Sequence, residues 1–422
     1  MRRTTRASVA VLAVGMLALT ACGRSDEPAA EATSAAPVAS NDLSGTVTVW
    51  AMGTEGEALG DFSKAFTEKY PDVKIDVTAI PWDAAHDKIA TAIAADEVPD
   101  VSMIGTTWMG EFAATGGLDQ TPDIVDKSTF FDGAWGSTVV GDVSYGVPWY
   151  VETRVIYLDT ALAQSAGVSP TPATWDDLTA TAKGLQSAGA QWGINLQPGA
   201  TGAWQTFLPF AWQAGAELMS SDGKLTLDTP EMVKALTYYQ SFFTDGVAPK
   251  ELPDGSLEPD FVAGKIGSFV SGPWHIGILK DTGGADEMSK VTLAPMPADV
   301  KPASFIGGSN LAVFKSSKNR DAAWTFVQWL SDPKTQADWY AKTSDLPAVQ
   351  SAWTEGTLAD DPALKVFGDQ LKTAVAAPAI PTWEQIASVI DTELEKVCKS
   401  GEDPAQAAKN IQQQADQIGT GL

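Results

Sequence analysis

The sequence of 422 residues has very few of the side chains on which metal and redox chemistry depend. It holds 2 cysteines, Cys22 and Cys398, and 2 histidines, His86 and His275. Two cysteines cannot build a disulfide framework, and no HExxH, CxxC, GxSxG or GxxxxGK[ST] pattern occurs. The sequence therefore gives no support to a zinc hydrolase, a dithiol redox protein, a serine hydrolase or a nucleotide hydrolase. We expect neither a cofactor nor a metal ion.

Positive charge is scarce as well. Lysine and arginine total 28 against 53 aspartates and glutamates, which gives a formal net charge of −25. A chain so acidic, with no basic stripe, is not expected to bind nucleic acid or to be attracted to anionic lipid headgroups. Beyond the first 21 residues the sequence has no apolar run long enough to span a bilayer.

The N-terminal segment has the layout of a secretory signal. Three arginines in MRRTTRAS precede the short apolar run VAVLAVGMLAL, and LTAC follows, ending at Cys22. This quartet resembles the bacterial lipobox, which implies cleavage of residues 1–21 and lipidation of Cys22. Residues 23–44 are rich in Ala, Ser, Pro and acidic residues, so we expect a tether that holds the protein at the extracytoplasmic face of the membrane. Cys398 then has no disulfide partner within the chain.

From Gly45 the sequence alternates between strand and helix patterns. GTVTVWAMG, VKIDVTAIP and DVSMIG read as strands, and GEALGDFSKAFTEKYP, WDAAHDKIATAIAADEVP and EFAATGGL read as helices. Such βαβ units predict a mostly parallel sheet, and a chain of this length predicts at least two lobes. Ligands of such sheets bind beyond the carboxyl ends of the strands, here WAMGTEG with Glu55, AIPWD, and IGTTW with Trp108.

The stretch SFVSGPWHIGILK, residues 268–280, places a tryptophan directly after a Gly-Pro pair. Pro273 fixes its own φ and Gly272 tolerates unusual backbone angles, so the pair forms a rigid corner that can aim Trp274 at a ligand. The alternative is that Trp274 belongs to the hydrophobic core. On strand alternation His275 points to the opposite side, and we expect it to be structural.

A second candidate lies in GVPWYVETRVIYLDTALA, residues 146–163. Strand alternation places Tyr150, Glu152 and Arg154 on one face. The two charged groups can form a buried structural ion pair. Alternatively, Glu152 accepts hydrogen bonds from ligand hydroxyls, while the Arg154 guanidinium either fixes that carboxylate or donates to the ligand.

With these motifs, the chain from about residue 45 to residue 422 resembles the solute-binding lipoproteins of bacterial ABC importers, in the family of the maltose-binding and trehalose/maltose-binding proteins. GVPWYVETRVIY is similar to the strand that carries a sugar-binding carboxylate, at Glu152, and SGPWHIG to the segment whose tryptophan stacks on sugar, at Trp274. NLQPGATGAWQTFLPFAWQAG and AAPAIPTWEQI resemble segments that bring further stacking aromatics, with Trp204 (Trp212 as second choice) and Trp383 at those places.

The resemblance implies an α/β, two-lobed, periplasmic-binding-protein-like (type II) fold with a hinge and a ligand cleft between the lobes. Residues 45–152 and 305–350 are expected in one lobe, and residues 153–304 and 351–422 in the other. The expected function is the capture of a di- or oligosaccharide by a monomeric binding protein, without catalysis, for an ABC permease served by a separate ATPase. Trp204, Trp274 and Trp383 would face the sugar rings, and Glu152, Arg154 and Asn310 their hydroxyl edges.

One departure and two alternatives remain open. In IGTTWMG only Thr107 and Trp108 can contact ligand, where maltose binders use charged side chains, so specificity for maltodextrin does not follow. A secreted glycoside hydrolase needs only two carboxylates, and 53 acidic residues leave that possible. A ferric-ion-binding protein of the same architecture could use the pair Tyr238 and Tyr239, although the helical spacing of MVKALTYYQSFF buries at least one of them.

Overall fold

The computed structural model describes residues 35–39 and 42–422, and its compact unit extends from Ala35 to Leu422. The predicted signal, the lipidation site Cys22 and tether residues 23–34 and 40–41 lie outside the described residues. Within the described part, no helix is both long enough and apolar enough to traverse a bilayer.

The larger of two main sheets has seven strands in the order β11-β6-β10-β3-β1-β2, with β12 paired to β10. They are β1 (Gly45–Met52), β2 (Val73–Ile80), β3 (Val101–Gly105), β6 (Val147–Thr153), β10 (Ser304–Val313), β11 (Leu346–Pro347) and β12 (Ala374–Val375). The predicted parallel arrangement holds for β2, β1 and β3, but β10 runs antiparallel between β3 and β6. The chain leaves this sheet through β6 and re-enters it through β10, so the returning strand runs in the opposite direction.

The predicted βαβ elements are present in the N-terminal part. The helices are α1 (Gly53–Phe62), α2 (Lys64–Lys69), α3 (Trp82–Ala95), the short 3-10 turn η1 (Thr106–Trp108) and α4 (Met109–Ala114). The sequence predicted one helix where α1 and α2 are separate. The break falls at Ser63, whose Oγ and backbone N–H both donate to the carbonyl of Leu59, at 2.7 Å and 2.9 Å, and a second donor of this kind bends a helix.

The smaller sheet has the order β8-β7-β9, with antiparallel neighbours. Its strands are β7 (Val155–Asp159), β8 (Ser268–Ser271) and β9 (Val291–Ala294). Only Arg154 separates β6 of the large sheet from β7 of the small one, and the chain returns between β9 and β10. These passages lie where a hinge between lobes is expected, and the lobe boundaries given above stay a prediction.

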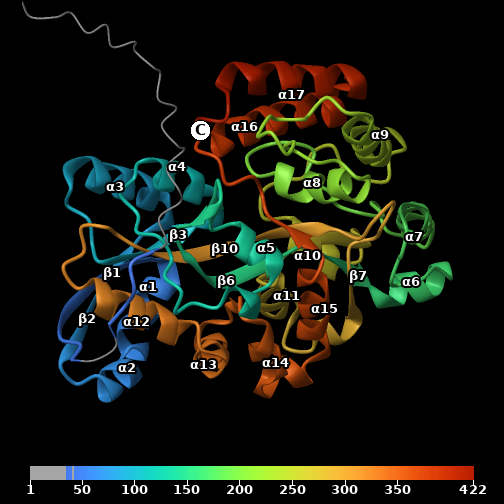
Figure 1. Ribbon diagram of the computed structural model, residues 1–422. Coiled ribbons are helices and arrows are strands. Elements are labelled where there is room, and N and C mark those ends of the chain that lie inside the picture. Colours follow the sequence, from blue (N-terminus) through green and yellow to red (C-terminus); the bar gives the residue numbers. More distant parts are fainter. Residues whose placement is uncertain (1–34, 40–41) are drawn as a thin grey trace, which may run out of the picture. The chain divides into compact units, whose positions relative to one another are not determined.

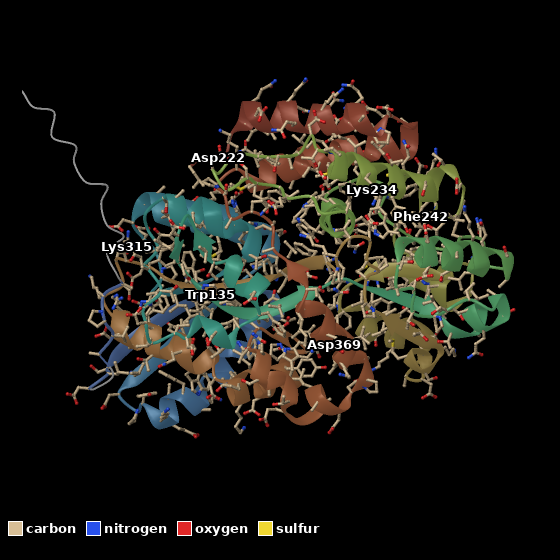
Figure 2. All side chains as sticks on the ribbon, turned by 45° about the vertical axis from the view of Figure 1, so that its right-hand side comes forward. Trp135, Asp222, Lys234, Phe242, Lys315 and Asp369 are labelled. Atoms are coloured by element: carbon tan, nitrogen blue, oxygen red, sulfur yellow. The ribbon has the colours of Figure 1, made fainter. Side chains whose placement is uncertain are left out.

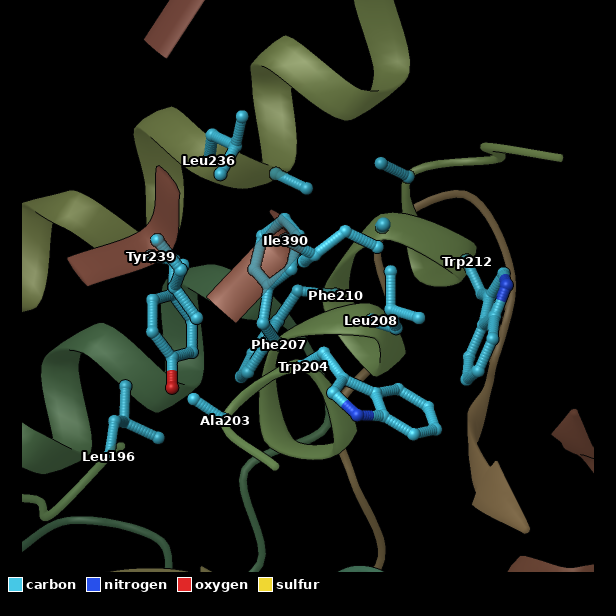
Figure 3. Close-up of a cluster of buried hydrophobic side chains, with 14 of the residues drawn as sticks. Leu196, Ala203, Trp204, Phe207, Leu208, Phe210, Trp212, Leu236, Tyr239 and Ile390 are labelled. Atoms are coloured by element: carbon cyan, nitrogen blue, oxygen red, sulfur yellow. The ribbon is translucent and has the colours of Figure 1, made fainter. Parts of the chain in front are cut away.

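Several helices contribute to a large cluster of buried apolar side chains, part of which Figure 3 shows. They are α6 (Thr160–Ala166), α7 (Trp175–Ser187), α8 (Trp204–Gln213), α9 (Pro230–Thr244), α16 (Trp383–Glu395) and α17 (Pro404–Ile418). In Figure 1, α17 lies along α16 and beside α9. Helix α9 is amphipathic: Phe242 is buried and Lys234 is exposed, both labelled in Figure 2.

The remaining helices and strands pack around the two main sheets or connect them. The helices are α5 (Asp132–Gly136), α10 (Leu257–Val262), α11 (His275–Gly283), α12 (Arg320–Leu330), α13 (Pro333–Thr343), α14 (Gly356–Asp360) and α15 (Pro362–Leu371). Strands β4 (Val139–Val140) and β5 (Val143–Ser144) form a hairpin. Further 3-10 turns are η2 (Lys127–Thr129), η3 (Glu287–Lys290) and η4 (Gln350–Thr354), and η5 (Lys396–Ser400) is a π-helical turn after α16. Helix α15 packs against strands of both main sheets, next to the cavity described below.

Candidate ligand-binding site

A cavity of about 650 Å³ opens at the carboxyl ends of β1, β2 and β3. The segments after these strands contribute Glu55, Trp82 and residues 106–108 to its wall, so the three strand ends that the sequence singled out do meet. Further wall residues come from β6, from β10, from the corner before α11 and from the turn between α13 and β11. The cavity is therefore built by segments far apart in the sequence, as binding sites in α/β sheets usually are.

The Gly-Pro corner presents Trp274 to this cavity. Strand β8 ends before Gly272, whose carbonyl accepts a hydrogen bond of 2.7 Å from the Tyr157 hydroxyl. A Cβ on Gly272 would lie 2.1 Å from Cζ3 of the Trp274 indole, so the ring lies directly over the glycine. Trp274 is 44% exposed and lines the cavity with Pro273. Trp274 therefore does not belong to the hydrophobic core.

His275 lies beside this corner but is turned into the protein. It is the first residue of α11, so helix geometry separates it from Trp274 and the expected strand alternation was wrong. Its Nδ1 lies 2.7 Å from the Ser271 hydroxyl and its Nε2 lies 2.9 Å from a carboxylate oxygen of Glu258. Burial lowers the pKa of His275.

Arg154 is buried behind the cavity wall and contacts four wall side chains. Its Nη1 donates to Oε2 of Glu152, its Nη2 donates to Oε1 of Gln205, and its guanidinium carbon lies 4.7 Å from the ring centroid of Trp274. The ring of Phe305 is 5.4 Å away from the same carbon. Arg154 is only 6% exposed and is not itself a wall residue. The sequence left open whether this guanidinium fixes Glu152 or donates to the ligand. Its geometry matches the first role, because it is buried and bonded to the carboxylate.

Glu152 reaches the cavity because its neighbour on β10 has no side chain. Gly307 pairs with Glu152 across the sheet, and a Cβ on Gly307 would lie 2.6 Å from Oε1 of Glu152. Burial raises the pKa of Glu152, and the charge and hydrogen bond of Arg154 oppose that rise. The carboxylate is thus held in one orientation, with Oε2 on Arg154.

A second set of polar side chains lines the cavity beside the large sheet. It consists of Glu55, Tyr150 and Asp345. Burial, followed by the negative charge of Glu55, raises the pKa of Asp345 to about 7. The Trp339 indole N–H donates to Oδ2 of Asp345 at 3.0 Å. Burial and the same Glu55 charge raise the pKa of the Tyr150 phenol, which therefore stays a neutral donor.

Besides Arg154, three predicted contact residues do not line the cavity. Trp204 and Trp383 are 3% and 0% exposed, and their rings meet edge to face at 5.1 Å inside the cluster of Figure 3, where Trp204 is labelled. Asn310 is 0% exposed between β3 and β6, and its Nδ2 donates to the Ser137 hydroxyl at 3.1 Å. The second choice, Trp212, is also buried. In the segment of α8 that the resemblance indicated, the residue that lines the cavity is Gln205, next to Trp204.

Of the tyrosine pair considered for iron, Tyr239 is buried in the core and Tyr238 is partly buried against it. The Tyr238 hydroxyl donates to the carbonyl of Trp175 at 2.7 Å, and the Tyr239 hydroxyl donates to the carbonyl of Gln197 at 2.8 Å. Burial raises the pKa of both phenols, which disfavours the phenolate form that binds ferric ion. The tyrosines thus act as structural side chains.

Comparison with known proteins gives a consistent result. Residues 53–337 match the model of the bacterial extracellular solute-binding protein family. The diacetylchitobiose binding protein DasA of Streptomyces coelicolor is 27% identical over 435 residues, covering 98% of this chain and 97% of that protein. The sugar-binding protein MalE from Xanthomonas citri superposes with a TM-score of 0.83 at 33% identity, covering 89% of this chain and 97% of that one. The GacH receptor of Streptomyces glaucescens, solved unliganded and with acarbose, gives a TM-score of 0.75 at 27% identity, covering 89% and 99%.

Proposed function

Because this chain belongs to the bacterial extracellular solute-binding proteins, we propose that it captures a di- or oligosaccharide in the cavity beside Trp274 and delivers it to an ABC permease. The observation that carries the proposal is the pairing of exposed indole faces with oriented carboxylates in one cavity. Trp82 and Trp274 are 39% and 44% exposed on its wall, and Glu152 is fixed beside Trp274. Pyranose rings offer apolar C–H faces and hydroxyl edges, which need these two kinds of partner.

The magnitudes are sufficient for such a ligand. An aromatic contact contributes about 0.5–1.5 kcal/mol beyond its buried area, and a hydrogen bond to a charged group contributes about 1.5–3 kcal/mol. Micromolar affinity needs about 8 kcal/mol net of the ordering cost. Two stacked indoles and several bonds to Glu55 and Glu152 are of this order, and Asp345, which is only partly ionised near pH 7, is a further hydrogen-bond partner. The proposed role is binding alone, so the sugar leaves the protein unchanged.

A thermal-shift panel tests the ligand class. We expect at least one of maltose, maltotriose, trehalose, cellobiose, N,N′-diacetylchitobiose and galactobiose to raise the melting temperature by a few degrees. A ligand at 100 times its Kd adds about 2.7 kcal/mol to stability, which in a chain of this size shifts melting by only a few degrees. Stabilisation by amino acids, peptides or ferric citrate, with none by any sugar of the panel, would show that the substrate class is wrong.

The site of action that we propose is the extracytoplasmic face of the membrane, with a lipid anchor on Cys22. The support is the sequence before and at Cys22, together with a family whose members are extracellular. Cys22→Ser should abolish lipidation, so the protein should be released from the membrane or keep its signal. Fractionation followed by mass spectrometry of the N-terminus measures both. A Cys22→Ser protein that is cleaved and still membrane-bound would contradict the anchor.

The transport cycle that we propose needs other polypeptides. The protein would act as a monomer whose lobes close on the sugar about the passages near Arg154 and between β9 and β10. The closed form would then dock on the permease, and a separate ATPase would supply the energy. The sequence has no phosphate-binding GxxxxGK[ST] loop of its own.

A further inference from the structure

Arg154 fixes the orientation of the side-chain amide of Gln205. Gln205 lies in the first turn of α8 and lines the cavity. Its Oε1 accepts from Nη2 of Arg154. A guanidinium has five donors and no acceptor, so the amide cannot be flipped without placing its NH₂ group against those donors. The carbonyl oxygen of Gln205 is therefore held toward Arg154, and the NH₂ group is directed away from it.

This NH₂ group has no hydrogen-bond acceptor among residues 35–39 and 42–422. Gln213, on the same helix, provides a contrast. Its Oε1 accepts from the Trp175 indole N–H at 2.7 Å, and its Nε2 donates to the carbonyl of Ala303 at 2.8 Å. A buried structural glutamine thus uses both ends of its amide, whereas Gln205, which is only partly buried, keeps its donor end available.

The guanidinium of Arg154 also fixes Glu152, and there it leaves a hydrogen-bond acceptor available on the cavity wall. Its Oε2 accepts from Nη1 of Arg154, and its Oε1 lies above Gly307 on the cavity wall. Nη1 and Nη2 are the two terminal nitrogens of one rigid plane, so the amide of Gln205 and the carboxylate of Glu152 are held side by side. Trp274 packs against that plane as well.

We propose that Gln205 Nε2 and Glu152 Oε1 act as a fixed donor and acceptor pair that binds two neighbouring hydroxyl groups of the sugar ring stacked on Trp274. One hydroxyl oxygen accepts from Gln205, and the next hydroxyl donates to Glu152. Gln205 is then a ligand-binding residue, and the sugar ring at this position must carry two adjacent hydroxyl groups. The inference rests on the proposed function, because it assumes a sugar in this cavity.

Gln205→Glu separates the binding role from the structural one. The new carboxylate can still accept from Arg154, so the contact that positions the side chain is preserved. It has no N–H to donate, and it adds a negative charge beside Glu152. Gln191→Glu is the matched control, since Gln191 is exposed, does not line the cavity and undergoes the same change in charge.

Calorimetric titration with maltotriose and with N,N′-diacetylchitobiose, together with any other sugar of the panel that stabilises the wild type, tests the pair. We expect Gln205→Glu to weaken binding by at least about tenfold, with apo melting within a degree of wild type and Gln191→Glu unchanged in both. Gln205 also borders a smaller cavity of about 300 Å³ next to Asp391. Unchanged affinity in Gln205→Glu would mean that its amide faces that cavity, and would overturn the inference alone. Absence of binding by the wild type to every sugar would overturn the proposed function, and this inference with it.

Discussion

Replacing Trp274 by alanine is expected to weaken sugar binding by about 10- to 100-fold while leaving most of the stability of the unliganded protein. The indole is 44% exposed on the cavity wall and packs on Gly272 and on the guanidinium of Arg154. The folded protein therefore loses one cation–π contact, worth about 0.5–1 kcal/mol, and the contacts of a half-buried ring, which is less than the loss of a fully buried tryptophan. A bound sugar loses the apolar face on which it stacks.

Trp383→Ala is the matched control for this experiment. Trp383 is 0% exposed, so its loss should lower the free energy of unfolding by about 3–5 kcal/mol, as for other core tryptophans. Urea unfolding measures stability and calorimetry measures affinity for the sugar identified in the panel. A Trp274→Ala protein that is as unstable as Trp383→Ala and binds sugar normally would place Trp274 in the core and the site elsewhere.

Replacing Arg154 by methionine is expected to damage both folding and binding. The substitution removes the partner of Glu152 and leaves a largely buried carboxylate without its ion pair, a change that typically costs about 3–5 kcal/mol. It also removes the group that orients Gln205 and supports the ring of Trp274. Affinity should fall below what calorimetry can detect.

The double variant Glu152→Gln with Arg154→Met tests the physical cause of that loss. Once the carboxylate is gone, much of the stability should return, because no uncompensated charge remains buried, but binding should stay weak. Urea unfolding of the wild type, both single variants and the double variant forms a complete cycle. Additive losses in the cycle would mean that Glu152 and Arg154 do not act as a pair.

The features that could be predicted from sequence are those encoded within short segments. The alternating residues of β1 and β2 and the periodic residues of α3 define these elements locally, and the Gly-Pro pair before Trp274 marks a corner wherever it lies in a fold. The meeting of the ends of β1, β2 and β3 could also be predicted, since parallel strands bring their carboxyl ends to one edge of the sheet.

The rest of the cavity depends on contacts between distant segments. Asp345 lies in the turn TSDLP, which has no periodic pattern, and becomes part of the wall only because β11 pairs with β6. Whether Trp204 or its neighbour Gln205 faces the cavity is decided by the rotation of α8, which depends on packing against Phe305 and Trp383. The antiparallel direction of β10 also depends on distant segments, because the chain comes back to the large sheet from the small one.

Titration calorimetry of the wild-type protein with the panel sugars, followed by chromatographic recovery of the sugar, measures both binding and turnover. We expect saturable binding of one sugar molecule per chain, with the sugar recovered intact. Release of new reducing ends during the titration would contradict this expectation in favour of a glycoside hydrolase, and the absence of any binding heat from carbohydrates would contradict it altogether.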